Sequence, residues 1–598
     1  MPGLLAVHAR VRGDRVALRE KRLGVWREIT WRGYYEHVRA AAAMLAELGV
    51  RPGDHVAILS DNRVEWLYAD LAAQALGARS VGIYQTNPAA DVAYILQDSG
   101  SSVLFCEDQE QVDKAVAIAA ETPSVKHVVV FDPRGTSHLG DARLMPWEDF
   151  LARGKALVDP AFDERLAKLD PAVPSMVVYT SGTTGPPKGA MISSRNILEV
   201  AQPFQEKMGF TDRDTVLSYL PLCHVAEKIV SMFTPLTSGA VVHFGESLET
   251  VQTDLREVSP TIFLGVPRIW EKMNAGVTVK MLDSSWLKRT LYKFFTRRGI
   301  EIAKRRNAGT LTAADRLVWA LGDFFVFRSL QERLGLRRCR WALTGAAPIS
   351  ADLIRWYHGI GVGISEGYGQ TECGGISHIN LPGANRIGTV GTSVPLVEHR
   401  LADDGEILVR GPNVFCGYLN QPEATAATID ADGWLHTGDI GEIDRDGYLT
   451  ITGRKKDIII TAGGKNLSPE KIENALKTSP YIKEAISIGD RRKFVGALVQ
   501  IELDNVGNWA TRRGLPYTSY ADLAAKPEVI DLVKGAIEAA NELLVPVEQV
   551  KAFKILPKEL SQDDGELTAT QKVRRREVMA TFGDLIESMY GRASGEKP

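Results

Sequence analysis

Short apolar segments alternate with helical patterns from about residue 34 to about residue 450, and this alternation constrains the fold more than any other feature. YYEHVRAAAAMLAELGV has the spacing of an amphipathic helix that ends at Gly49, and HVAILS after it is typical of a buried strand. VEWLYADLAAQALGA predicts another helix, and further strands are predicted at SVLFC, VKHVVVF, SMVVYTS, TVLSYL and AVVHFG. Strands that alternate with helices form parallel sheets covered on both faces, so the sequence predicts an α/β fold.

The pattern changes near residue 395. EHRLADDGEILVRGP, GEIDRDGYLTITG and AISIGD are short strands joined by Asp-Gly turns, which are typical of β-hairpins. We place a domain boundary at Gly453 to Asp457. The prediction is a large N-terminal domain of layered sheets and helices (1–453) followed by a small α+β C-terminal domain (454–598).

Composition excludes several classes of protein. The chain has 71 Lys and Arg against 74 Asp and Glu, so its net charge of −3 argues against a nucleic-acid partner. Five cysteines lie far apart and form no CxxC pair, which fits a reducing cytosol. The N-terminal apolar run is too short for a signal peptide, and no apolar segment reaches the ~18 residues of a membrane helix. We expect a cytoplasmic protein, either soluble or lying on the inner face of a membrane.

The segment YTSGTTGPPKGA (179–190) follows the predicted strand SMVVYT and precedes the predicted helix SRNILEVAQPFQEK, with Ser193 or Ser194 as its cap. A strand, a Gly-rich loop and a helix are how α/β proteins hold phosphate, with backbone N–H groups and hydroxyls converging on the anion. Lys188 would add a positive charge. Because Gly189 and Ala190 follow it instead of Ser or Thr, this is not a P-loop NTPase. A surface loop is the less favoured alternative.

Seven further motifs accompany this loop: LPLCHVAEK (220–228), FLGVPRIWEKM (263–273), ALTGAAPIS (342–350), GYGQTE (367–372), GWLHTGD (433–439), GRKKDIIITAGGKNLSPEKIE (453–473) and LTATQKVRRREV (567–578). With the loop, they resemble in kind and order the motifs of the adenylate-forming enzymes, which include acyl-CoA synthetases, luciferases and peptide-synthetase adenylation domains. The resemblance runs from about residue 14 to residue 576. It is most similar to the long-chain fatty-acid branch at LPLCHVAEK, VPRIWEKM and the basic segment 286–340.

The resemblance implies a luciferase-like fold whose two domains are joined by a hinge. It also implies that the ATP and AMP site is built from Thr180, Ser181, Gly182, Thr183, Thr184, Lys188, Gly345, Ala346, Ala347, Gly367, Tyr368, Gly369, Thr371, Asp439 and Arg454, with Thr184 also acting in catalysis. Gly345, Ala346 and Ala347 would form one wall of the adenine slot.

GYGQTE can also be interpreted without the resemblance. Tyr368 lies between Gly367 and Gly369, which let the backbone approach a ligand, and its ring can stack on adenine. Glu372 is a hard oxygen ligand suited to Mg²⁺ bound to phosphate, and we assign it both a metal and a catalytic role. A tight turn with a surface Glu is the alternative, and the neighbouring motifs favour the ligand site.

Asp439 and Arg454 are connected by the predicted hairpin IGEI–DRDG–YLTIT, which turns near Arg445 and Asp446. Antiparallel pairing would place Asp439 opposite about Thr452, two residues from Arg454. A carboxylate that can accept from two vicinal hydroxyls would then lie near a guanidinium, which suits a ribose. The alternative is an ordinary surface ion pair, worth under ~1 kcal/mol.

Lys572 follows Thr568 and Thr570 and precedes three arginines, so composition alone favours a solvated basic tail. The resemblance implies instead a mobile catalytic lysine that bridges the substrate carboxylate and the α-phosphate. It also places the hinge at Lys456 in GRKKD, because the family often has Asp or Lys there.

Acyl-site residues are the hardest to predict. His224 is a candidate gate beside the acyl entrance, although a histidine after a strand is as often a satisfied core residue. Gly374 and Gly375, just after Glu372, would leave room for a chain.

The segment 286–306 carries eight basic residues and one acidic residue. Leu287, Leu291, Phe294, Phe295 and Ile302 fall roughly on one face of the predicted helix. Such a helix could rest on anionic lipid. A core-packed helix with a solvated basic face is slightly preferred.

The function predicted from these motifs is ATP-dependent activation of long-chain fatty acids to acyl-CoA through acyl-AMP, with ATP, Mg²⁺ and coenzyme A taking part. Two alternatives remain within the same chemistry: a fatty acyl-AMP ligase that loads an acyl carrier protein, and a CoA ligase for another hydrophobic carboxylic acid. A non-catalytic nucleotide-binding regulator is disfavoured, because Lys188, Glu372, Asp439, Arg454 and Lys572 are all present. Oligomeric state is not predicted.

Overall fold

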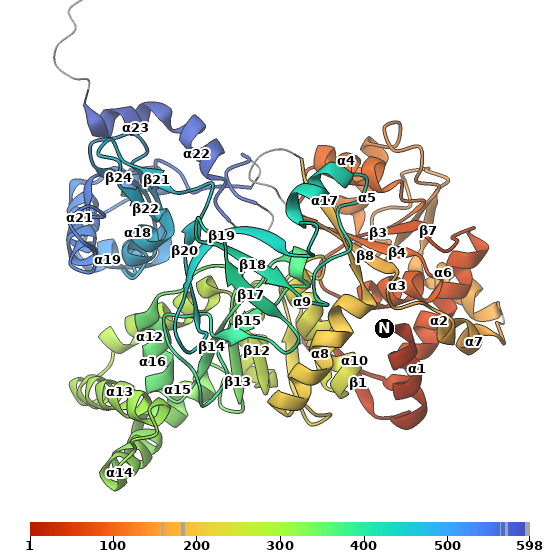
Figure 1. The fold of residues 1–598 in the computed structure, drawn as a ribbon, viewed down its shortest axis with the longest axis horizontal. Helices are drawn as coiled ribbons and strands as arrows, with labels where there is room; N and C mark the ends of the chain where they lie inside the picture. Colours follow the sequence, from red (N-terminus) through yellow and green to blue (C-terminus); the bar gives the residue numbers. More distant parts are fainter. Residues whose placement is uncertain (158, 181–185, 563, 569–571, 592–598) are drawn as a thin grey trace, which may run out of the picture.

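The computed structural model describes residues 1–598 except 158, 181–185, 563, 569–571 and 592–598. Three sheets and their helices make up the chain as far as Arg454, and a smaller lobe follows, coloured blue in Figure 1. The predicted α/β class is confirmed. No helix formed by the described residues is long and apolar enough to cross a bilayer.

A seven-stranded sheet is formed, in spatial order, by β7 (Leu144–Pro146), β6 (His127–Val130), β5 (Val103–Cys106), β3 (His55–Leu59), β4 (Arg79–Ile83), β8 (Pro174–Thr180) and β9 (Lys188–Ser193). Neighbouring strands are parallel except β8 and β9. One face packs against α2 (Trp31–Glu47), α3 (Val64–Ala75) and α6 (Trp147–Ala156), and the other against α4 (Ala89–Ser99) and α5 (Gln109–Ala117). Successive side chains of a strand point to opposite faces of the sheet, so both faces are apolar. Leu104 and Phe105 on β5, for example, belong to different core clusters.

A nine-stranded sheet is formed by β16 (Thr392–Ser393), β15 (His378–Ile379), β14 (Ile364–Tyr368), β13 (Trp341–Thr344), β12 (Ile262–Leu264), β10 (Thr215–Ser218), β11 (Val241–Phe244), β1 (Val16–Arg22) and β2 (Val25–Thr30). Its middle is parallel and its two ends are antiparallel. One face shares a core with the first sheet through α8 (Ser194–Met208) and α10 (Thr234–Ser238). The other face packs against α11 (Val251–Val258), α12 (Pro267–Leu282) and α16 (Ala351–Gly359).

The third sheet is antiparallel and consists of β17 (Glu398–Leu401), β18 (Glu406–Arg410), β19 (Leu435–Ile443) and β20 (Leu449–Arg454). These are the Asp-Gly hairpins predicted from the sequence. In Figure 1 this sheet lies between the two large sheets and the smaller lobe. Its last strand ends at Arg454, and an exposed turn at 455–457 leads into the smaller lobe.

The smaller lobe contains the two-stranded sheet of β21 (Ile459–Ile460) and β22 (Asn466–Leu467) and the three-stranded sheet of β23 (Ile482–Ile488), β24 (Val495–Ile501) and β25 (Val550–Ile555). One core cluster joins the three-stranded sheet to α18 (Pro469–Leu476), α19 (Leu503–Arg512), α20 (Tyr520–Ala525) and α21 (Pro527–Asn541). A second cluster joins it to α22 (Arg575–Thr581) and α23 (Gly583–Tyr590). Each lobe therefore has its own core, while the boundary at 453/454 stays a prediction.

The basic helix α13 (Trp286–Asn307) packs on α16 through Gly299. Phe295 and Ile302 are buried, whereas Leu287 and Phe294 are exposed. The apolar residues of α13 therefore divide between the core and solvent. One side of the helix joins the core, as the preferred alternative expected, and Leu287 and Phe294 remain exposed.

Gly299→Ala tests the close contact of α13 with α16. A Cβ there would overlap the carbonyl oxygen of Gly359 and lie 2.9 Å from the Phe327 ring. We expect the substitution to lower the free energy of unfolding by about 1–3 kcal/mol, which is typical of overpacking. Gly276→Ala in α12 is the matched control, because nothing lies within 4 Å of its added Cβ. Thermal unfolding that places both variants at the same midpoint would contradict the packing.

Candidate active site

The strand predicted before Ser181 and the helix predicted at SRNILEVAQPFQEK are confirmed as β8 and α8, and Lys188–Ser193 form an additional strand, β9, that was not predicted. β8 ends at Thr180, and Lys188 opens the antiparallel strand β9, with Thr180 and Lys188 as paired residues. Helix α8 begins at Ser194, and Ser193 caps it through reciprocal hydrogen bonds with Asn196, as predicted. Strand β9 was missed because it is stabilised by pairing with β8, not by local propensity. Ser181, Gly182, Thr183 and Thr184 lie outside the described residues.

Lys188 is linked to Glu372 through Tyr418. The Lys188 ammonium lies 5.0 Å from the centre of the Tyr418 ring, and the Tyr418 hydroxyl donates to Glu372 Oε1 at 2.7 Å. A bridge between Ala190 and Tyr418 fixes the tyrosine beside β9. Sequence reasoning missed Tyr418. Its only signal was a Gly–Tyr pair like the one at 367–368.

The ends of β13 and β14 bring two predicted segments together. A Cβ on Gly345 would lie 3.0 Å from the Gly367 carbonyl oxygen, so both backbones meet at glycine. Ala346 has a φ of 66° in the left-handed region, which strains a residue with a Cβ. Ala346 and Ala347 are exposed, whereas Tyr368 is buried. The two segments therefore border one surface, as the adenine-slot hypothesis requires.

A short turn of helix, η3 (Thr371–Cys373), carries Glu372 after Gly369. Gly369 packs on the next turn of chain, since a Cβ there would lie 2.5 Å from the Gly375 carbonyl oxygen. Gly374 and Gly375 have left-handed φ values of 64° and 89°.

The open room expected beside these glycines is not found. A Cβ on Gly375 would lie 2.7 Å from Ile229 Cδ1 and 3.1 Å from the Val225 methyl groups. The space beside this glycine is occupied by α9 (Val225–Lys228) and η1 (Ile229–Phe233). Glycine is required here by its φ and by this close approach.

Asp439 and Arg454 are direct partners across β19 and β20. The prediction placed Asp439 opposite Thr452, two residues from its partner: the hairpin is paired one residue later than predicted, and a register shift between Ile440 and Gly441 adds the second residue. Arg454 Nε lies 3.1 Å from Asp439 Oδ1. The predicted hairpin and the proximity of the two charges are therefore present, with a closer pairing than expected.

Asp439 is also held by GYGQTE. The Tyr368 hydroxyl donates to Asp439 Oδ2 at 2.6 Å, and Gln370 Nε2 donates to the same oxygen at 2.7 Å. Gln370 further donates to the Thr437 carbonyl oxygen at 2.8 Å. Burial and the negative charge of Asp439 hold the pKa of the Tyr368 hydroxyl well above its usual value, so it remains a donor. Sequence reasoning missed Gln370, because its contacts come from a strand about 70 residues away.

Lys572 of the smaller lobe interacts with the same charges. Solvent reaches its side chain, yet the surrounding protein atoms lower the pKa of the ammonium, and the positive charge of Arg454 lowers it further. The carboxylates of Asp439, Glu470 and Glu372 oppose this effect. The Lys572 backbone N–H donates to Thr568 Oγ1 at 3.0 Å. Lys572 therefore lies near enough to Asp439 on β19 and to Glu372 after β14 for their charges to act on its pKa.

His224 caps α9, and its Nδ1 accepts from the Ala226 backbone N–H at 3.1 Å. Burial lowers the pKa of its imidazole to about 4, and the positive charge of Lys572 adds to the effect. His224 is therefore neutral at pH 7 and lies close enough to Lys572 to feel its charge. Lys456 is exposed in the turn at 455–457, where the Asp457 backbone N–H donates to the Arg454 carbonyl oxygen.

Within the part of the chain that the structure describes, no three His, Cys, Asp or Glu residues gather to hold a metal ion. Glu372 offers one carboxylate beside Lys188 and Tyr418, and Tyr418 contacts Oε1. Magnesium is commonly held by one or two carboxylates together with substrate phosphates. The residues present fit that mode and not a cage made of protein ligands alone.

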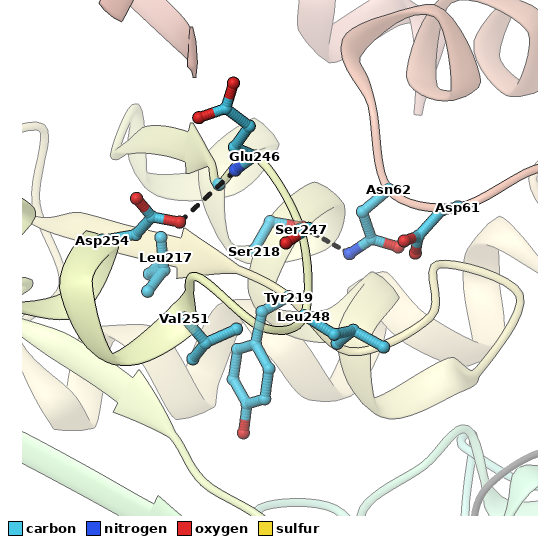
Figure 2. A pocket seen from close by; sticks show the side chains of 11 residues that line it. Asp61, Asn62, Leu217, Ser218, Tyr219, Glu246, Ser247, Leu248, Val251 and Asp254 are labelled. Carbon is cyan, nitrogen blue, oxygen red and sulfur yellow. Dashed lines mark hydrogen bonds between the residues drawn. The ribbon is translucent and has the colours of Figure 1, made fainter. Parts of the chain in front are cut away.

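A separate small pocket lies where β3, β10 and β11 end (Figure 2). It is polar, since Asn62 donates to Ser218 Oγ at 2.9 Å and the Glu246 backbone N–H donates to Asp254 Oδ2 at 3.3 Å. None of the residues predicted for the site lines this pocket.

The AMP-binding enzyme family matches residues 5–419, and the AMP-binding enzyme C-terminal domain matches residues 456–594. The chain belongs to the AMP-binding enzyme family. It is 36% identical over 574 residues to the long-chain-fatty-acid–CoA ligase FadD15 of Mycobacterium bovis, covering 95% of this chain and 93% of that one. It is 32% identical to the long-chain-fatty-acid–CoA ligase ACSBG2 of Xenopus laevis, covering 97% and 82%.

Solved structures agree on the fold of this AMP-binding enzyme. The adenylation domain of a carboxylate reductase from Mycobacterium chelonae superposes with a TM-score of 0.75 at 22% identity, covering 98% of this chain and 90% of that one. The anthranilate CoA ligase AuaEII superposes with a TM-score of 0.72 at 22% identity, covering 97% and 96%. The predicted luciferase-like fold, with a large N-terminal and a small C-terminal part, is confirmed.

The pKa of His224 tests whether Lys572 occupies this place in solution. We expect Lys572→Ala to raise the pKa of His224 from about 4, because a nearby positive charge disfavours the imidazolium. The measurement is a pH titration of ¹³C-labelled histidine by NMR, with the signal assigned through His224→Asn. Lys493→Ala removes an exposed lysine elsewhere in the smaller lobe and is the control. An unchanged His224 pKa in Lys572→Ala would place the lysine elsewhere.

Proposed function

We propose that this protein activates long-chain fatty acids with ATP to acyl-AMP and pyrophosphate, and then transfers the acyl group to coenzyme A. The observation that carries the proposal is the convergence of Lys572 from the smaller lobe with Asp439, Glu372 and Arg454 from the larger one. The two ligases named above supply the substrate class, since they span nearly the whole chain.

The first half-reaction needs no catalytic base. A fatty acid is already a carboxylate at pH 7, and its oxygen attacks the α-phosphorus while the bond to the pyrophosphate oxygen breaks. The obstacle is the repulsion between two anions. Lys188 and Lys572 bring positive charge to the site, which lowers that repulsion and stabilises the charge that develops on the phosphoryl oxygens.

The nucleotide would extend across the three segments that meet at the site. The segment 180–188, with Thr180, Ser181, Gly182, Thr183, Thr184 and Lys188, would bind the phosphates. The adenine would lie between Gly345–Ala347 and Gly367–Gly369, with Tyr368 against its ring and Thr371 at the turn that follows.

Asp439 would bind the ribose hydroxyls. A carboxylate has about four acceptor positions, and Tyr368, Gln370 and Arg454 use three of them here. One position is open, and the Tyr368 hydroxyl can leave Asp439 when a ribose hydroxyl replaces it as donor.

Mg²⁺ bound to the phosphates would be held by Glu372, where it would neutralise charge on the phosphate oxygens. Tyr418 keeps Glu372 oriented toward Lys188 by its hydrogen bond. Glu372 thus acts through its charge, and the hydrogen bond from Tyr418 fixes where that charge lies.

The acyl group would enter past His224, which lies close to Lys572. Gly374 and Gly375 would border its path. Because Ile229 and Val225 now fill the space beside Gly375, an acyl chain on this side requires these two side chains to move.

The second half-reaction needs a different partner in the same place. Coenzyme A thiolate attacks the acyl carbonyl carbon, and AMP leaves. A rotation of the smaller lobe (454–598) against the larger domain (1–453) about Lys456 would withdraw Lys572 and open a path for the thiol. The protein would work in the cytoplasm, with no nucleic-acid partner.

Release of AMP across carboxylic acids of increasing length, with and without coenzyme A, tests the proposal. We expect AMP release to depend on coenzyme A and to be fastest with long chains. Release that requires an acyl carrier protein instead would select the carrier-loading alternative. A preference for short or aromatic acids would select another hydrophobic acid, and no AMP with any acid would reject the proposed activity.

Lys572→Ala separates the two half-reactions. We expect ATP–pyrophosphate exchange to fall by about 10²–10³-fold, as when one stabilising contact to a developing charge is removed. Transfer from preformed acyl-AMP to coenzyme A should keep much of its rate. Arg576→Ala, which removes an exposed charge nearby, is the control. Equal loss of both steps would argue against the two-lobe assignment.

A cross-link between the lobes tests the rotation. Asp283 and Arg512 are exposed and pair across the two lobes at 2.9 Å. In a Cys416→Ser background, Asp283→Cys with Arg512→Cys can be joined by a short cleavable bismaleimide. We expect the joined protein to keep pyrophosphate exchange and lose acyl-CoA formation until the linker is cleaved. The same double variant before joining is the control. Undiminished acyl-CoA formation while joined would mean that no rotation is needed.

A further inference from the structure

Helix α13, helix α14 (Ala313–Gly322) and the π-helical turn η2 (Asp323–Phe327) form a projection that extends away from the rest of the molecule (Figure 1). We call residues 286–327 the α13–η2 projection. Its base is fixed to the core by Phe295, Ile302 and Phe327. None of the residues assigned to the nucleotide site lies in this projection.

Aromatic rings run across the outer surface of the projection. Phe294 lies 5.1 Å from Phe295 between ring centres, Phe295 lies 6.3 Å from Phe325, and Phe325 lies 5.0 Å from Phe324. Phe295 is buried, whereas Phe324 is 72% exposed and Phe294 and Phe325 are about half exposed. Phe294 and Phe325 thus lie beside the buried Phe295 ring, and Phe324 lies beside Phe325. These three exposed rings form one aromatic surface.

Aliphatic side chains continue this surface. Leu317 and Leu321 lie four residues apart on α14, and Phe324 follows three residues later in η2. Leu317 is 64% exposed. On α13, Leu287 and Phe294 are spaced seven residues apart and are both exposed. Exposed apolar side chains gathered on one projection mark an interaction surface.

Positive charge surrounds these side chains. Residues 286–328 carry ten basic and three acidic side chains, although the whole chain has a net charge of −3. Two of the three acids are already paired, Asp315 with Arg305 and Asp323 with Arg328. Arg298 lies over the Phe294 ring at 6.0 Å. The partner of this surface must therefore be both negatively charged and able to accept apolar side chains.

We propose that the α13–η2 projection docks on a bilayer that contains anionic phospholipid. Interleaved Phe, Leu, Lys and Arg residues match an interface in which apolar groups enter the acyl boundary and cations contact lipid headgroups. The purpose of this docking rests on the proposed function: long-chain fatty acids collect in membranes, and the projection would bring the enzyme to its substrate. It extends the sequence hypothesis, which named only 286–306, to α14 and η2.

Flotation with vesicles tests the docking. The vesicles are phosphatidylcholine alone or phosphatidylcholine with about 30 mol% phosphatidylglycerol, at NaCl from about 0.05 to about 0.5 M. We expect binding to the anionic vesicles that falls as salt rises, and little binding to phosphatidylcholine. An absence of binding to either would overturn the proposal.

Two sets of variants separate the apolar and charged parts. L317S/L321S/F324S should lower the partition coefficient for anionic vesicles at least about tenfold. K288E/R289E/K293E should lower it about a hundredfold, because each basic residue near the membrane surface contributes a factor of roughly five to binding. L23S/V25S removes exposed apolar groups at the β1–β2 turn, and R153E/K155E/K168E reverses three exposed charges elsewhere. These controls should bind as the wild type does. Equal losses in variants and controls would overturn the proposal.

AMP release from a soluble acid below its micellar concentration distinguishes failure of docking from failure of the proposed function. We expect L317S/L321S/F324S to keep this activity, because none of the three residues belongs to the nucleotide site. Vesicle binding without AMP release would reject the fatty-acid activity and keep the docking. A competition experiment with RNA tests the lipid assignment. If RNA displaces the protein from the vesicles, and the same variants lose binding to RNA and not to vesicles, the lipid assignment would be overturned.

Discussion

The carboxylate of Asp439 connects the parts of the molecule that the proposed chemistry needs. It lies on the third sheet, pairs with Arg454 at the end of that sheet, and accepts hydrogen bonds from Tyr368 and Gln370 on the loop after the second sheet. It is buried, so an unpaired charge there would cost several kcal/mol. Its three partners therefore fix the third sheet against the second, and any ribose bound here must replace or join them.

The charge of Asp439 also helps to hold the smaller lobe. The surrounding protein atoms and the positive charge of Arg454 disfavour the Lys572 ammonium and lower its pKa, whereas the carboxylates of Asp439, Glu470 and Glu372 favour it. Direct contacts between the lobes include polar ones, such as Gln562 donating to the Thr86 carbonyl oxygen at 2.8 Å and the pair of Asp283 with Arg512. Polar contacts of this kind resemble transient interfaces and permit domain rotation. A site that closes by electrostatic attraction can open when the phosphates that balance it leave.

Sequence patterns predicted the parallel strands, the Asp-Gly hairpins and the positions of the charged residues, because each depends on local spacing. They did not predict β9, since its stability comes from pairing with β8. They placed Asp439 two residues from its true partner, because neither the exact pairing of the hairpin nor the register shift within it has a local sequence signature. Gln370 and Tyr418 were missed because their partners come from distant segments. On α13, helical spacing could not show that Leu287 and Phe294 face water while Phe295 joins the core.

A structure with a long-chain fatty acid and the ATP analogue whose α- and β-phosphates are joined by methylene tests the account most directly, because that analogue cannot lose pyrophosphate. The account predicts both ribose hydroxyls on Asp439, the adenine beside Tyr368, and the Lys572 ammonium between the α-phosphate and the fatty-acid carboxylate. A ribose bound away from Asp439, or a Lys572 turned away from both anions, would contradict it.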